Sequence, residues 1–104
     1  MNIFIVGIGL IGGSMALDIQ KQYSEAVIYG IDVNEHHLNE ALEIGVIHKK
    51  ADYSDLEKAT IVIVSIPVDV QLEVIPKILD AIDDNTLVMD VGSTKAQICE
   101  AIKD

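Results

Sequence analysis

Short apolar runs alternate along the chain with longer segments in which apolar residues recur every three or four positions. The runs are rich in Ile and Val and show little polar alternation, which is typical of strands buried on both faces of a parallel sheet. Recurrence every three or four positions instead predicts helices with one apolar face. The expected strands are residues 3–6, 27–31, 46–48, 61–66 and 86–91, and the expected helices are residues 10–22, 34–44, 68–82 and 96–103.

Polar residues and one proline set the expected ends of these helices. Asn34 is a good N-cap for the second helix, and Gly45 is a good stop at its C-terminal end. Residues 54–59 predict a short helical turn in which Ser54 and Glu57 form a capping box. Pro76 falls inside the third helix, and we expect it to kink or split that helix.

The alternation of strands and helices, with short connections and no internal repeat, predicts an α/β fold with a doubly wound parallel sheet. Right-handed crossovers then give three αβα layers and the strand order 3-2-1-4-5. The length of 104 residues suits one domain with its own core, residues 1–104. Ligands of such sheets bind at the carboxyl ends of the strands, in the crevice between strands one and four, where the strand order reverses.

Three glycines follow the first expected strand with the spacing G-x-G-x-x-G, which is a dinucleotide-binding fingerprint. Gly7 is expected to permit the tight turn out of the strand. Gly9 is expected to let a diphosphate approach the backbone, and Gly12 to let the next helix pack closely on the sheet. Unpaired N–H groups at the start of that helix would bind the phosphates. The sequence therefore predicts a Rossmann NAD(P)-binding fold.

Asp32 stands at the end of the second expected strand, 20 positions after Gly12, as the fingerprint requires. Its carboxylate can accept hydrogen bonds from the adenosine ribose hydroxyls and would repel a 2′-phosphate, so we expect NAD in preference to NADP. The alternative is a glycine-rich turn with a surface aspartate and no ligand. Three agreements of context (the preceding strand, the following helix and the spacing) favour the binding site.

Composition narrows the possible partners. The formal net charge of −10 argues against nucleic acid, which needs clustered basic side chains. No apolar run approaches the length of a membrane span, and Cys99 stands alone, so we expect a cytoplasmic protein without an internal disulfide. We expect no metal site. His36, His37 and His48 are expected to face solvent.

The glycine segment at residues 7–16, GIGLIGGSMA, resembles the opening of prephenate and arogenate dehydrogenases, which read GxGLIGGSxA. The resemblance continues through Asp32, through residues 65–68 (SIPV) and through residues 90–95 (DVGSTK), which match the family pattern D-x-G-S-x-K. These four segments cover essentially the whole chain. The first and the last of them are the specific ones, because the other two occur widely among Rossmann dehydrogenases.

The resemblance implies an NAD-dependent prephenate dehydrogenase, which oxidises and decarboxylates prephenate to 4-hydroxyphenylpyruvate in tyrosine biosynthesis. The substrate would be prephenate or arogenate. The resemblance also implies roles for individual residues. Leu10 and Ile11 would join the three glycines around the diphosphate, Ser65, Pro67 and Val68 would line the nicotinamide half of the groove, and Ser93 would be the active-site serine.

The resemblance further implies a histidine base after the serine motif and arginines that hold the substrate carboxylates. This chain has no Arg and reaches Asp104 before such a histidine, so we expect a fragment that lacks a C-terminal helical substrate and dimerisation domain. The complete enzyme would be a homodimer, and a monomeric fragment stays open. Two alternatives stay open: another Rossmann oxidoreductase, of the pyrroline-5-carboxylate reductase or β-hydroxyacid dehydrogenase type, and a non-catalytic NAD-binding regulatory module.

Overall fold

The computed structural model describes residues 1–90 and 97–98. Strands and helices alternate along nearly all of this part of the chain, as the hydrophobic pattern predicts. The elements in order are β1 (Asn2–Val6), α1 (Leu10–Gln22), β2 (Val27–Ile31), α2 (Glu35–Glu43), β3 (Lys49–Lys50), the 3₁₀-helix η1 (Tyr53–Lys58), β4 (Ile61–Val64), α3 (Val68–Ala81), β5 (Leu87–Asp90) and β6 (Gln97–Ile98).

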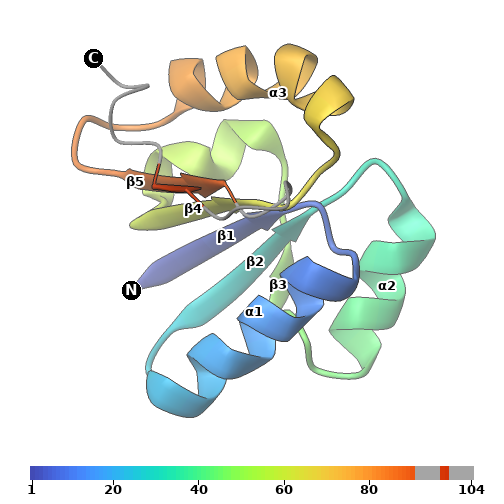
Figure 1. Cartoon of the computed structure of the whole chain (residues 1–104). Helices are drawn as coiled ribbons and strands as arrows, with labels where there is room; N and C mark the ends of the chain where they lie inside the picture. Colours follow the sequence, from blue (N-terminus) through green and yellow to red (C-terminus); the bar gives the residue numbers. More distant parts are fainter. Residues whose placement is uncertain (91–96, 99–104) are drawn as a thin grey trace.

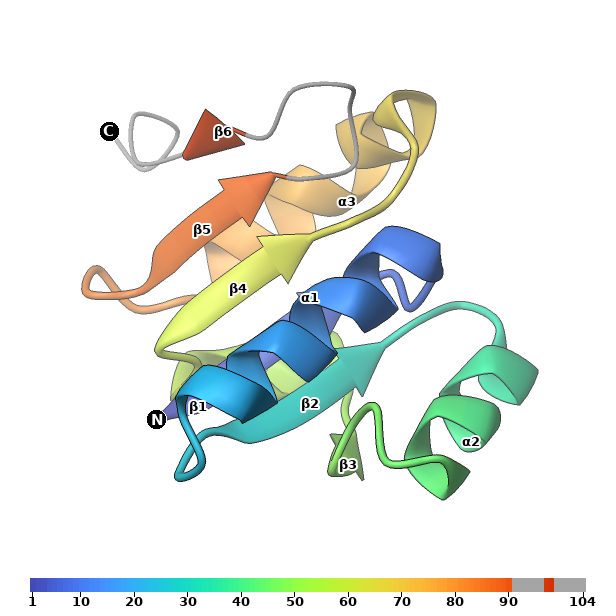
Figure 2. The same ribbon diagram turned by 60° about the horizontal axis from the view of Figure 1, so that its bottom comes forward.

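The strands form one sheet in the order β3-β2-β1-β4-β5-β6. The first five strands of this order are parallel to their neighbours, which confirms the predicted doubly wound order 3-2-1-4-5. β1 lies at the centre, between β2 and β4, so the chain runs outward from β1 in one direction and then in the other. Figure 2 shows the arrowheads of β2, β4 and β5 pointing the same way, toward the end of the sheet where α1 begins.

Two layers of helices cover the sheet. α1 and α2 lie on one face, and α3 and η1 lie on the other (Figure 1). Successive residues of β1 serve the two faces in turn: Ile3 and Ile5 join the core under α1 and α2, while Phe4 and Val6 join the core under α3 and η1. All four side chains are almost completely buried. This explains why β1 reads as an unbroken apolar run.

The predicted third strand and the predicted cap of the short helix are both wrong in position. Residues 46–48 are a loop whose apolar side chains fill the core, and the edge strand is the next pair of residues, Lys49–Lys50. The N-cap of the short helix lies two residues earlier than expected. Asp52 is its N-cap, and the Asp52 N–H donates to a carboxylate oxygen of Asp55 at 3.0 Å, so Ser54 and Glu57 do not form the box.

The C-terminal prediction is also corrected. A helix was expected from residue 96, but Gln97–Ile98 is a short strand that pairs antiparallel with β5, while residues 99–103 lie outside the described part. An antiparallel edge strand is common on an otherwise parallel sheet. Pro76 lies inside α3 and does not split it. Within the described residues, no helix combines the length and the apolar character that crossing a membrane requires.

Candidate functional site

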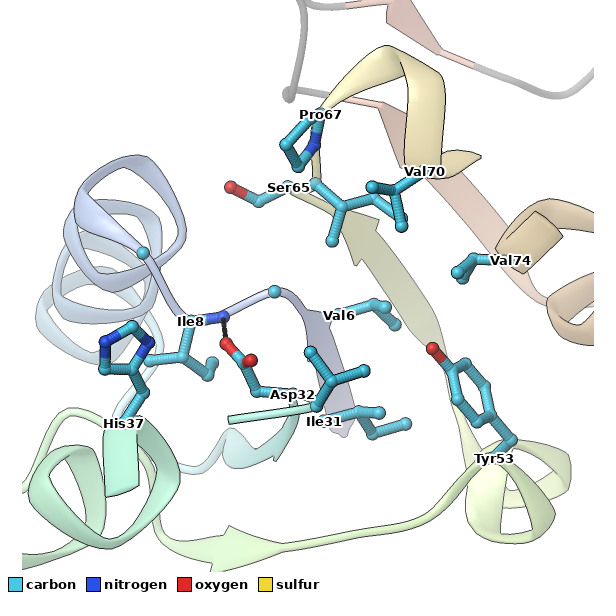
Figure 3. A pocket seen from close by; sticks show the side chains of 14 residues that line it. Val6, Ile8, Ile31, Asp32, His37, Tyr53, Ser65, Pro67, Val70 and Val74 are labelled. Atoms are coloured by element: carbon cyan, nitrogen blue, oxygen red, sulfur yellow. Dashed lines mark hydrogen bonds between the residues drawn. The ribbon is translucent and has the colours of Figure 1, made fainter. Parts of the chain in front are cut away.

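A pocket of about 250 Å³ opens at the carboxyl ends of β1, β2 and β4 (Figure 3). This is where the strand order reverses and where ligands of doubly wound sheets bind. Five of the residues expected at the site line it together, although they come from three separate segments. They are Gly7, Gly9, Asp32, Ser65 and Pro67.

Gly7 and Gly12 hold the turn after β1 in a shape that other residues would not tolerate. Gly7 has a φ of +96°, and a Cβ atom there would lie 2.5 Å from the carbonyl oxygen of Ser65. A Cβ atom on Gly12 would overlap the carbonyl oxygen of Gly7 and press on Ile5. The structure thus confirms the two predicted backbone roles: Gly7 makes the tight turn, and Gly12 brings α1 close to the sheet.

The start of α1 is open. Gly9 is the N-cap, it makes no side-chain hydrogen bond to the helix, and the first turn carries no acidic residue. The backbone N–H groups of Leu10, Ile11 and Gly12 have no acceptor four residues earlier within the helix. A Cβ atom on Gly9 would have no atom within 4 Å. The helix therefore presents donors that have no intrahelical acceptor, and the positive end of its dipole, to an open space beside the pocket.

Asp32 follows β2 at the mouth of the pocket and is half-buried. Its Oδ2 atom accepts a hydrogen bond from the Ile8 N–H at 2.8 Å, and its Oδ1 atom accepts one from the Asn34 N–H at 2.8 Å. Figure 3 shows the first bond joining Asp32 to the loop between Gly7 and Gly9. Asp32 therefore supports the glycine loop as well as facing the pocket. The first of these roles was not predicted from the sequence.

The wall of the pocket opposite Asp32 is apolar. Ile66, from the loop after β4, and Val70 and Val74, from α3, form this wall. These residues are missing from the predicted site because apolar residues at helical spacing look the same whether they line a pocket or fill a core. A flat, apolar ligand face fits such a wall.

Tyr53 and His37 also line the pocket and were not predicted there. Tyr53 comes from η1, and no motif marks it. Burial raises the pKa of its hydroxyl above the usual value of 10, and the Asp32 carboxylate raises it further. The hydroxyl therefore stays protonated at neutral pH and can donate a hydrogen bond. His37 was expected to face solvent. It is exposed, and it stands at the pocket rim.

The remaining predicted residues are placed as follows. Ser65 lies beside the glycine loop, since a Cβ atom on Gly12 would be 3.4 Å from its Cβ atom. In Figure 3 its side chain points away from Val70 and Val74. Val68 is the first residue of α3. Ser93 lies outside the described residues.

This geometry agrees with the comparison to known proteins. Residues 15–104 match the family model described as prephenate dehydrogenase, nucleotide-binding domain. The chain is 38% identical over 102 residues to a prephenate dehydrogenase of Bacillus subtilis (strain 168), and the match covers 95% of this chain and 28% of that protein.

Two solved structures are also similar, and each match covers 91% of this chain and 34% of the other. One is the prephenate dehydrogenase of A. aeolicus in complex with hydroxyphenyl propionate and NAD+, with a TM-score of 0.83 and 30% identity. The other is the Synechocystis arogenate dehydrogenase, with a TM-score of 0.81 and 28% identity. The chain spans about a third of the length of these relatives or less. With the family model matching most of its length, the chain belongs to the nucleotide-binding domains of the prephenate dehydrogenase family.

Proposed function

We propose that this chain binds NAD⁺, with the diphosphate at the start of α1 and the adenosine ribose at Asp32. One observation carries the proposal: Asp32 is hydrogen-bonded to the glycine loop through Ile8, at 2.8 Å. The ribose acceptor is therefore held close to the uncapped start of α1. One nucleotide needs both, because its ribose and its diphosphate are bound at the same time. The A. aeolicus relative, whose structure contains NAD⁺, supports the same reading.

The apolar wall of Ile66, Val70 and Val74 suits the adenine base, because it faces Asp32 across the pocket and can exclude water from a flat ring. Ser65, Pro67 and Val68 would then guide the cofactor from this pocket toward its nicotinamide half. Leu10 and Ile11 would contribute their backbone N–H groups to the diphosphate, together with the loop glycines.

We expect calorimetry to show NAD⁺ binding at least tenfold more tightly than NADP⁺. The Asp32 carboxylate would accept hydrogen bonds from the ribose hydroxyls of NAD⁺ but would repel the 2′-phosphate of NADP⁺. The chain has no Arg that could neutralise this phosphate. Equal affinities for the two nucleotides would count against the role given to Asp32, and no binding of either would contradict the proposed site.

We further propose that residues 1–104 are the cofactor domain of a longer dehydrogenase that oxidises and decarboxylates prephenate. Bound NAD⁺ would supply the hydride acceptor, and the domain would orient it. In this proposal Ser93 hydrogen-bonds the substrate hydroxyl and orients a histidine base contributed by the rest of the enzyme. The chain has no arginine that could hold the substrate carboxylates.

In the complete enzyme, we expect Ser93→Ala to lower kcat on prephenate at least tenfold and to leave the Kd for NAD⁺ nearly unchanged. The lost hydrogen bond belongs to the substrate and the base, not to the nucleotide. Steady-state kinetics and calorimetry on the same preparation separate the two quantities. Parallel assays with prephenate and arogenate identify the preferred substrate, and an unchanged kcat would remove Ser93 from the site.

A further inference from the structure

Gln71 joins two segments that meet at the open end of the sheet. It lies near the start of α3, and its side chain is half-buried. The Nε2 atom donates to the carbonyl oxygen of Ile66 at 3.0 Å and to Oδ1 of Asp90 at 3.0 Å. A carboxamide nitrogen carries two hydrogens, so both bonds can form at once. One side chain therefore holds the loop after β4 against the end of β5.

The Ile66 peptide has little other support from its neighbours in the chain. Ser65 before it is still hydrogen-bonded to β1, since its N–H donates to the carbonyl oxygen of Val6 at 2.8 Å. Pro67 after it has no N–H to donate. The bond from Gln71 therefore restrains the loop at the point where it leaves the sheet.

This loop matters for the pocket because of what Ile66 touches. Its side chain forms part of the apolar wall, and its Cγ2 atom lies 2.6 Å from the point where a Cβ atom on Gly7 would stand. The wall and the glycine loop are thus in direct contact. A shift of the Ile66 peptide would change the width of the pocket and the position of the turn after β1.

We propose that Gln71 is a positioning residue for the nucleotide: its carboxamide sets the Ile66 wall against the glycine loop and ties that wall to the end of β5. The inference rests on the proposed binding of NAD⁺ in this pocket. The bond to the Asp90 carboxylate is of the stronger, charge-assisted kind. Asp90 is also the first residue of the D-x-G-S-x-K segment, so the same contact joins the nucleotide wall to the base of the segment that carries Ser93.

The test compares Gln71→Met with the matched control Gln20→Met. Met keeps the length of the side chain and removes both N–H donors. Gln20 also donates two hydrogen bonds from its Nε2 atom, to the carbonyl oxygens of Gly45 at 3.1 Å and Val46 at 2.8 Å. It does not line the pocket. We expect both variants to lower Tm by about 10 °C, because each loses two hydrogen bonds and the loss of one lowers Tm by about 5 °C in a small domain.

Only Gln71→Met should weaken NAD⁺ binding, by about tenfold in Kd, which corresponds to about 1.4 kcal/mol. Calorimetry is done at a temperature where circular dichroism shows both proteins folded. Gln71→Glu is the second variant. It keeps the shape but sets a carboxylate against the Ile66 carbonyl and Asp90, and should weaken NAD⁺ binding further.

An unchanged Kd in both Gln71 variants, or an equal loss in Gln20→Met, would overturn the positioning role. The unmodified protein reports on the proposed function separately. If it binds NAD⁺ while the Gln71 variants bind equally well, the inference alone fails. If it does not bind NAD⁺, the proposed function fails and the inference fails with it.

Discussion

Gly9→Asp is expected to abolish measurable NAD⁺ binding, with a loss of at least a hundredfold in affinity, and to leave the fold as stable as before or slightly more stable. Gly9 is the N-cap of α1 and has an ordinary extended conformation, with φ −109° and ψ −161°. A Cβ atom there would meet no atom within 4 Å. Asp is a better N-cap than Gly, and a negative charge at a helix start is itself stabilising, so we expect a gain of up to about 1 kcal/mol.

The same carboxylate would take the place of the diphosphate. It would bond to the first N–H groups of α1 and repel the phosphates from the open start of the helix. Stability and binding should therefore change in opposite directions, which a general loss of structure cannot produce. Thermal unfolding and NAD⁺ calorimetry on one preparation measure both.

Two neighbouring glycines serve as controls for this variant. Gly12→Ala should cost about 2 kcal/mol or more of unfolding free energy, because its Cβ atom would overlap the Gly7 carbonyl oxygen. Gly13→Ala should stabilise the protein by about 0.5–1 kcal/mol, because Gly13 lies inside α1 and its Cβ atom would meet only Val46, at 3.8 Å. If Gly9→Asp binds NAD⁺ as the unmodified protein does, the diphosphate does not sit at α1.

The parts of the fold that the sequence predicts are those whose pattern has one physical explanation. The unbroken apolar residues of β1 and β4 fit only strands that are buried on both faces, and the long periodic segment of α1 fits only a helix. The third strand was misplaced because Val46 and Ile47 are buried from a loop, and burial alone does not distinguish a loop from a strand. The edge strand consists of exposed lysines, which carry no apolar signal.

The candidate site also has a part that the sequence predicts and a part that it does not. The glycine loop and Asp32 were predictable because the backbone turn and the ribose acceptor demand particular residues at fixed spacing. The apolar wall and Tyr53 were not, because they come from the loop after β4, from α3 and from η1, and only the tertiary fold brings η1 to the other two. Nor does any pattern reveal that Asp32 and Gln71 each hold two groups at once.

The two hydrogen bonds that the Asp32 carboxylate accepts determine what the loss of this carboxylate should do. We expect Asp32→Ala to weaken NAD⁺ binding by about a hundredfold, because charge-assisted hydrogen bonds to the ribose are worth about 1.5–3 kcal/mol each. NADP⁺ binding should change much less. Loss of the carboxylate removes the repulsion of the 2′-phosphate, but it also leaves the Ile8 N–H, and with it the glycine loop, without its acceptor. The preference for NAD⁺ should therefore narrow through lost NAD⁺ affinity, without a gain of tight NADP⁺ binding.

Asp83→Ala is the matched control. The Oδ1 atom of Asp83 accepts from the Asn85 N–H at 2.8 Å, the same local bond that Asp32 makes to Asn34, but in the turn before β5, at the other end of the sheet. Both variants lose this turn contact, so a comparable fall in Tm is expected from its loss in each. Calorimetry with both nucleotides then isolates the ribose contact and the loop contact of Asp32. If Asp32→Ala bound NADP⁺ more tightly than the unmodified protein binds NAD⁺, the carboxylate would be only a barrier to phosphate and not a support of the glycine loop.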